Sequence, residues 1–114
     1  CPEFVLAVPG PELSQAALTF GTLSGRSVHK FEKAGLTPVA AKFITPPLIQ
    51  ECLVNHECRL TGQLDSGDHT IFVGEVLASW VSEQAGPILC SIGTEDGFQE
   101  TLTAGRYRFG FVKE

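Results

Sequence analysis

Two long segments rich in apolar and β-branched residues, separated by a short turn, constrain this chain more than any other feature. Residues 52–64 alternate loosely between apolar and polar side chains, and residues 69–81 (HTIFVGEVLASWV) form the strongest candidate strand. The residues between them include 66–68 (SGD), which are typical of a turn. The pattern predicts a β-hairpin. Gly74, inside the second strand, indicates a bulge or a close approach to another backbone or ligand.

The rest of the chain predicts shorter elements. Apolar side chains at helical spacing after Pro11 predict a helix that ends near Gly21. Ser27 is a suitable N-cap for a second helix over residues 28–34. Extended segments are expected at residues 3–8, 37–45, 87–92 and 106–112. These elements predict a mainly β (α+β) fold with a barrel-like sheet and two short helices.

Length and charge narrow the classes of protein. A chain of 114 residues suits a single domain, 1–114. Its 8 Lys and Arg against 13 Asp and Glu give a net charge of −5, whereas nucleic-acid binders usually carry the opposite balance. No apolar run approaches the roughly 18 residues that a membrane span needs. We therefore expect neither a nucleic-acid partner nor a membrane partner.

The four cysteines, at positions 1, 52, 58 and 90, are too few for a dense disulfide framework. Without a recognisable signal segment, reduced thiols in the cytoplasm are the simpler expectation. Cys52, His56 and Cys58 would spread over about 20 Å of an extended strand. That span is too long for one tetrahedral zinc ion, so buried thiols are expected and no metal site is predicted.

A cluster of cations is the first candidate binding site. Arg26, Lys30 and Lys33 fall within eight residues of an acidic protein. They follow Ser24 and Gly25 at the expected start of the second helix, where free N–H groups favour anions. Ser24, the Gly25 amide, Arg26 and Lys30 could hold a phosphate. From physical chemistry alone, an ordinary solvated first turn is the stronger alternative, and neither GxGxxG nor the P-loop motif is present.

The hairpin turn is the second candidate. His69 leaves the turn at the start of a strand, and Asp68 is near enough to orient its ring. An imidazole there could hydrogen-bond a ligand, although a plain surface residue is the stronger alternative by itself. No Ser or Cys lies in a GxSxG pattern. The aromatic residues Trp80, Tyr107, Phe109 and Phe111 are expected in the core or at an interface.

Several ungapped stretches, taken in order, are similar to one known family. They are residues 4–6 (FVL), 21–31 (GTLSGRSVHKF), 32–37 (EKAGLT), 46–49 (PPLI), 57–58 (EC) and 67–76 (GDHTIFVGEV). In this order they resemble the flavin reductase-like, or flavoredoxin-like, family of FMN-binding split barrels. The resemblance covers about residues 3 to 81 and becomes vague after about residue 87.

The resemblance implies a homodimeric split β-barrel that holds FMN without a covalent bond near the dimer interface. It implies electron transfer from a reduced nicotinamide, NAD(P)H, or another donor, and thus an NAD(P)H:flavin oxidoreductase if flavin is bound. His69 would lie beside the flavin ring or the nicotinamide as the catalytic residue. The cofactor-binding residues carried over by position are Thr22, Ser24, Gly25, Arg26, Ser27, Lys30, Phe31, Tyr107 and Phe109. Lys30 and His69 are therefore expected to face one shared cavity.

The chain also departs from the family pattern. Members usually carry further N-terminal strands before the strand at Phe4, and they commonly have Asp where this chain has Ser27 and His29. The barrel is therefore expected to be incomplete, with an open sheet edge that dimerisation could cover. One alternative is a truncated, non-catalytic fragment that oligomerises and binds flavin weakly or not at all. Another is a protein that binds a different small anion at residues 24–30.

Overall fold

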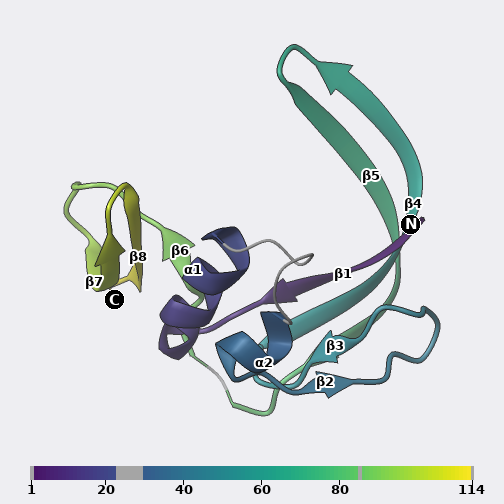
Figure 1. Ribbon diagram of the computed structural model, residues 1–114, viewed down its shortest axis with the longest axis horizontal. Helices are drawn as coiled ribbons and strands as arrows, with labels where there is room; N and C mark the ends of the chain where they lie inside the picture. Colours follow the sequence, from purple (N-terminus) through teal and green to yellow (C-terminus); the bar gives the residue numbers. More distant parts are fainter. Residues whose placement is uncertain (1, 23–29, 85, 114) are drawn as a thin grey trace.

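The predicted hairpin is the largest element of the structure. The computed structural model describes residues 2–22, 30–84 and 86–113. Strands β4 (Val54–Ser66) and β5 (His69–Val81) pair antiparallel over their whole length, with register shifts near Glu57 and Leu60. The distal half of this hairpin, residues 60–74, is here called the arm and stands away from the rest of the molecule (Figure 1). The hairpin prediction is confirmed, except that residues 52–53 precede β4.

Strand β1 (Glu3–Val8) adds to this hairpin as predicted. It pairs antiparallel with the first half of β4, which gives a three-stranded sheet in the order β1-β4-β5. Phe4 lies against β5 at Gly74, where an added Cβ atom would be 2.6 Å from the ring's Cζ. The close approach expected at Gly74 is therefore made by an aromatic side chain.

The first predicted helix is present in two parts. Pro11–Leu13 form a 3-10 turn, and α1 (Ser14–Thr22) follows directly. The Ser14 hydroxyl donates to the Pro11 carbonyl at 2.7 Å and also hydrogen-bonds Thr101 Oγ1 at 2.6 Å. This second bond ties α1 to the C-terminal sheet.

The second helix, α2 (Lys30–Ala34), is shorter in the described residues than the range 28–34 expected for it. Residues 28 and 29 of the prediction lie outside the described part of the chain. Phe31 of α2 packs edge-on against Phe20 of α1, with ring centroids 5.8 Å apart. The two helices therefore meet through their aromatic side chains.

The prediction of extended chain over residues 37–45 is wrong beyond Val39. Only β2 (Pro38–Val39) is a strand there, and it pairs with β3 (Leu48–Ile49). Between these two strands the N–H groups of Lys42 and Phe43 donate to the side chain of Glu57. Because that carboxylate takes the place of a neighbouring strand, the segment bends instead of pairing.

The C-terminal part forms a separate sheet. Strands β6 (Cys90–Ser91), β7 (Phe98–Ala104) and β8 (Tyr107–Val112) are ordered β6-β8-β7. The strand expected at 87–92 is confined to two residues, because Pro87 lacks an N–H and Leu89 N donates to the Pro9 carbonyl instead. Strand β7 was not predicted. The strand expected at 106–112 is β8.

The core is small. Among the described residues, its buried apolar side chains are Ala16, Leu36, Ile44, Leu48, Cys52 and Cys58. Large exposed apolar side chains occur along the arm, among them Leu64, Ile71, Phe72 and Val73. The structure is mainly β with two short helices, as predicted, and its three sheets do not close into a barrel within the described residues. Within that same part of the chain, no helix is long and apolar enough to span a membrane.

Candidate flavin site

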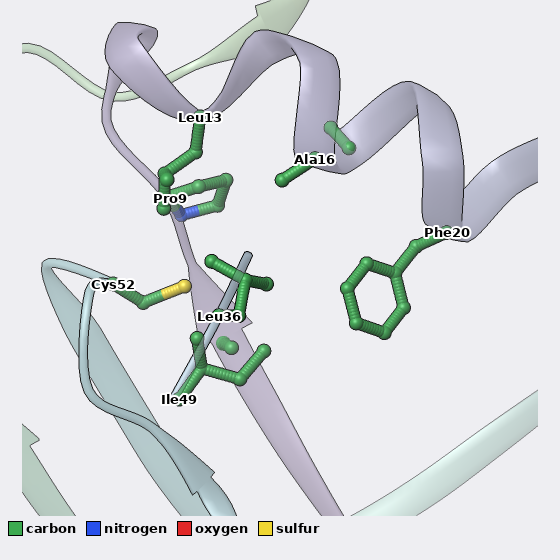
Figure 2. Close-up of a pocket in the computed structure, with 9 residues that line it drawn as sticks. Pro9, Leu13, Ala16, Phe20, Leu36, Ile49 and Cys52 are labelled. Atoms are coloured by element: carbon green, nitrogen blue, oxygen red, sulfur yellow. The ribbon is translucent and has the colours of Figure 1, made fainter. Parts of the chain in front are cut away.

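An apolar cavity of about 280 Å³ lies between α1 and β1 (Figure 2). This cavity, here called the first cavity, is lined by Ala7, Pro9, Leu13, Ala16, Ala17, Phe20, Leu36, Ile49 and Cys52. Polar groups contribute little to this surface. The cavity can therefore take an apolar or aromatic group, and it offers no charge to an ionic one.

A second cavity, of about 290 Å³, adjoins the first along β1. It is lined by Glu3, Phe4, Val5, Ala7, Phe31, Pro46, Pro47 and Ile49, so Ala7 and Ile49 border both cavities. The aromatic pair of the two helices contributes one ring to each, Phe20 to the first and Phe31 to the second. One side of β1 is thus bordered by two apolar cavities.

The Cys52 thiol borders the first cavity but is not an activated nucleophile. Burial raises its pKa to about 11, and the nearby carboxylates of Glu51 and Glu12 act in the same direction. A thiol with this pKa stays protonated at neutral pH. Cys52, Cys58 and Cys90 are free, and no group of three or more potential metal ligands gathers among the described residues.

The predicted phosphate-binding residues fall at the junction between α1 and α2. Ser24, Gly25, Arg26 and Ser27 lie outside the described residues, as does the side chain of Lys30, the first residue of α2. Thr22 is the last residue of α1, and its hydroxyl donates to the Leu18 carbonyl at 2.7 Å. Phe31 lines the second cavity. The helices on either side of the cationic segment therefore both reach the cavity walls.

His69 lies at the far end of the arm, away from α2 (Figure 1). Its Nδ1 is 2.6 Å from Asp68 Oδ1, the contact expected from the sequence, and its side chain is 79% exposed. It lines neither the first cavity nor the second. Within one chain the described residues do not bring His69 together with α2, and the side chain of Lys30 lies outside them, so the cavity expected to be shared by Lys30 and His69 stays a prediction.

Tyr107 and Phe109 belong to the C-terminal sheet. Their rings stack on each other with centroids 6.3 Å apart, and the Arg106 guanidinium lies 5.4 Å from the Tyr107 centroid. Both side chains are partly exposed and line neither cavity. In the single chain, the two rings therefore stack on each other.

Sequence reasoning quoted Glu57 only as part of the EC stretch at residues 57–58 and gave it no role. Its side chain is completely buried, and it accepts hydrogen bonds from Lys42 N, Phe43 N and Trp80 Nε1. The only local feature of the sequence that could have indicated a buried carboxylate is the presence of an acidic residue next to Cys58 in an otherwise half-buried strand. Asn55, two residues earlier, was also overlooked, and it is equally part of this buried polar set.

Comparison with known proteins identifies the family. A model of the flavin reductase like domain matches residues 1–95. The chain belongs to the flavin reductase-like family. An uncharacterized protein of Archaeoglobus fulgidus is 49% identical over 77 residues, which cover 68% of this chain and 44% of that protein. One from Pyrococcus abyssi is 41% identical over 83 residues, or 73% of this chain and 47% of the relative. This family member spans less than half the length of these two relatives.

Solved structures agree with the split-barrel fold. The flavoredoxin of Desulfovibrio vulgaris is 25% identical with a TM-score of 0.72, covering 99% of this chain and 60% of that one. The flavoredoxin of Methanosarcina acetivorans is also 25% identical, with a TM-score of 0.69 and coverages of 99% and 59%. An NADH:FAD oxidoreductase of Streptomyces globisporus is 28% identical, with a TM-score of 0.63 over 71% of this chain and 47% of that chain. The flavin reductase-like fold expected from the sequence is confirmed.

Proposed function

We propose that this chain is an FMN-binding oxidoreductase module of the flavoredoxin or flavin reductase type. The observation that carries the proposal is that residues 24–30, the cationic segment, lead in the sequence from α1 into α2, two helices whose aromatic rings line adjoining apolar cavities. A phosphate at one end and a flat ring at the other are the two parts of FMN that such a site would separate. A solved relative from Streptomyces globisporus, 30% identical, is described in complex with NAD and FAD fragments, which supports nucleotide ligands of this kind.

The phosphate would be held by the segment between α1 and α2. Arg26 and Lys30 supply positive charge, and Ser24 and the Gly25 amide supply neutral donors. Thr22 and Ser27 border this set. In a protein of net charge −5, these local cations would be needed to offset a dianionic phosphate.

The ring system would lie in the second cavity. At about 290 Å³ this cavity is near the lower limit for small-molecule sites, so it suits part of the cofactor and not all of it. Phe31, Pro46 and Pro47 give it apolar walls that fit an aromatic ring. Its one acid, Glu3, already accepts a hydrogen bond from Thr45 N at 3.0 Å. Bound flavin would supply the redox chemistry, taking electrons from a reduced nicotinamide or another donor and passing them to an acceptor.

A homodimer is part of this proposal. The arm is only two strands wide beyond β1, and apolar side chains are exposed on both of its faces, with Ile71 and Val73 on one face and Phe72 on the other. A two-stranded ribbon is marginal by itself, so a second copy is a suitable cover. In such a dimer, His69 of the partner subunit would complete the flavin site. The free thiols support a reducing, cytoplasmic location.

Flavin fluorescence tests the cofactor. Added FMN should be quenched on binding, and Lys30→Ala should weaken binding by about 1.5–3 kcal/mol, the range for a charge-assisted hydrogen bond. Lys33→Ala, in the last turn of the same helix, is the matched control and should bind like the unmodified chain. No quenching at tens of micromolar FMN would reject flavin binding and favour the alternative, a non-catalytic split-barrel fragment that oligomerises.

Mixed dimers test where His69 acts. Lys30→Ala and His69→Ala chains should each have little reductase activity. Mixing them in equal amounts should restore about a quarter of the normal sites, because half of the dimers would be mixed and each would carry one intact site. If His69 acted within its own chain, mixing would restore no activity. Light scattering on Phe72→Asp, a change at an exposed arm position, should show monomers.

A further inference from the structure

We propose that Glu57 is a positioning residue, whose buried carboxylate fixes residues 37–49, here called the strap, as a wall of the second cavity. The strap contributes Pro46, Pro47 and Ile49 to that cavity. The expected effect of Glu57 on FMN binding rests on the function proposed above, whereas its role in fixing the strap does not.

Three N–H groups from two elements converge on this carboxylate. Lys42 N donates to Oε2 at 2.9 Å, and Phe43 N donates to Oε1 at 2.7 Å. Trp80 Nε1, from β5, donates to Oε2 at 2.7 Å. With 0% of Glu57 exposed, no solvent replaces these donors, so the carboxylate holds the strap and β5 together through β4.

Other side chains support the strap at its two ends. Asn55, on the same face of β4 as Glu57, accepts from Ile49 N and donates to Ile49 O, both at 2.9 Å. Glu51 accepts from Thr37 N and Thr37 Oγ1, both at 2.9 Å. The middle of the strap, around residues 42 and 43, is held by Glu57. Removal of the Glu57 carboxylate would therefore free residues 42 and 43, which lead into the cavity wall at Pro46 and Pro47, while Thr37 and Ile49 at the two ends stay attached.

The chemistry of the site requires an anion. Burial raises the pKa of Glu57, but the hydrogen bonds from Lys42, Phe43 and Trp80, with a smaller effect of the nearby Ile44 N–H, together outweigh burial and lower it. The group is thus held ionised in a fully buried position. A glutamine would place an NH₂ donor where one oxygen now accepts, so one strap N–H or the indole would face a donor and lose its bond.

Two readouts follow the strap without any flavin. Lys42 and Phe43 have exposed side chains, so the bond after Lys42 is a trypsin site whose cleavage requires the backbone to leave Glu57. Trp80 is the only tryptophan in the chain, so its emission reports on the indole that Glu57 holds. Cleavage after Lys42 is followed by mass spectrometry because other Lys and Arg residues are also trypsin sites.

The test compares Glu57→Gln with Glu12→Gln, an exposed glutamate outside the strap. Glu57→Gln should be cut after Lys42 about tenfold faster or more than the unmodified chain, as expected for a segment that opens locally. Its tryptophan emission should shift and its FMN affinity should fall, while far-UV circular dichroism stays unchanged. Glu12→Gln should change none of these.

Glu57→Asp keeps the charge on a shorter side chain and should give an intermediate cleavage rate. This variant provides the comparison with the unmodified chain if Glu57→Gln does not fold. An unchanged rate of cleavage after Lys42 in both variants would overturn the proposal that Glu57 fixes the strap. Faster cleavage with unaltered FMN affinity would overturn the positioning role. If the unmodified chain binds no FMN, the proposed function fails, and the cleavage rates still decide whether Glu57 fixes the strap.

Discussion

The indole of Trp80 donates to the carboxylate of Glu57 across the β4–β5 pair, with 2.7 Å between Nε1 and Oε2. The acceptor is completely buried, whereas 43% of Trp80 remains exposed. The tryptophan therefore acts less as a core side chain than as one of the donors that make a buried anion tolerable. This pair connects the hairpin to the strap and hence to the candidate flavin site.

Trp80→Phe should destabilise the protein by about 1–3 kcal/mol, because the carboxylate loses a donor that no water replaces. Urea denaturation followed by circular dichroism measures the change. A double-mutant cycle with Glu57→Gln separates this bond from the lost packing of the larger ring. Strictly additive effects in the cycle would show that the two side chains do not interact.

Acid should destabilise the fold through Glu57 and Glu51. Hydrogen bonds from Thr37 lower the pKa of Glu51, and N–H bonds outweigh burial to lower that of Glu57. A carboxyl with a lowered folded-state pKa contributes stability above its unfolded value, about 4.5, and loses it as the pH falls through the folded value. Urea midpoints should therefore be level at neutral pH and fall below about pH 4.5. An identical pH profile in Glu57→Gln would contradict the assignment to Glu57.

Gly74→Ala should cost about 1–3 kcal/mol, because the new Cβ would lie 2.6 Å from Phe4 Cζ and the ring would have to move. Gly62→Ala is the control in the partner strand, since nothing lies within 4 Å of an added Cβ there. Thermal unfolding measures both variants. Combining Gly74→Ala with Phe4→Leu should recover part of the loss if the clash is its cause.

Gly67→Ala should destabilise the hairpin turn by about 1 kcal/mol, because Gly67 has a φ of +63°, a conformation that favours glycine. The turn lies at the tip of the arm, so the loss should also lower the yield of dimer in light scattering. Gly67→Asn, which tolerates this conformation better, should retain most of the stability. Equal losses in both variants would point to a cause other than backbone conformation.

Cys52 should react slowly with thiol reagents. A pKa of about 11 in place of 9.0 leaves about 100-fold less thiolate near pH 8. Cys52→Ala should therefore remove one slow thiol and leave the fast phase of labelling unchanged. In urea the unmodified chain should label one additional equivalent relative to Cys52→Ala. A lost fast phase in this variant would contradict the raised pKa.

Local patterns predicted the main elements well. The alternation in residues 69–81 and the turn at 66–68 led to the β4–β5 hairpin, and the apolar spacing after Pro11 led to α1. Residues 37–45 of the strap were predicted as extended chain, because their sequence contains no sign that Glu57 binds the N–H groups of residues 42 and 43. Strand β7 was overlooked because its pairing with β8 depends on a turn at residues 105–106 that was not recognised.

By itself, the sequence determined the mainly β fold, the long hairpin and the family, since each depends on residues that are neighbours in the chain or on ordered motifs. Only the tertiary structure decided that Glu57 is buried with three N–H partners, and that His69 lies at the end of an arm remote from α2. Glu57 and Phe43 are 14 positions apart, and Glu57 and Trp80 are 23 apart. The periodicity of the sequence predicts on which face of a strand or helix a side chain lies. The residue that this side chain contacts depends on how segments that are distant in the sequence pack together.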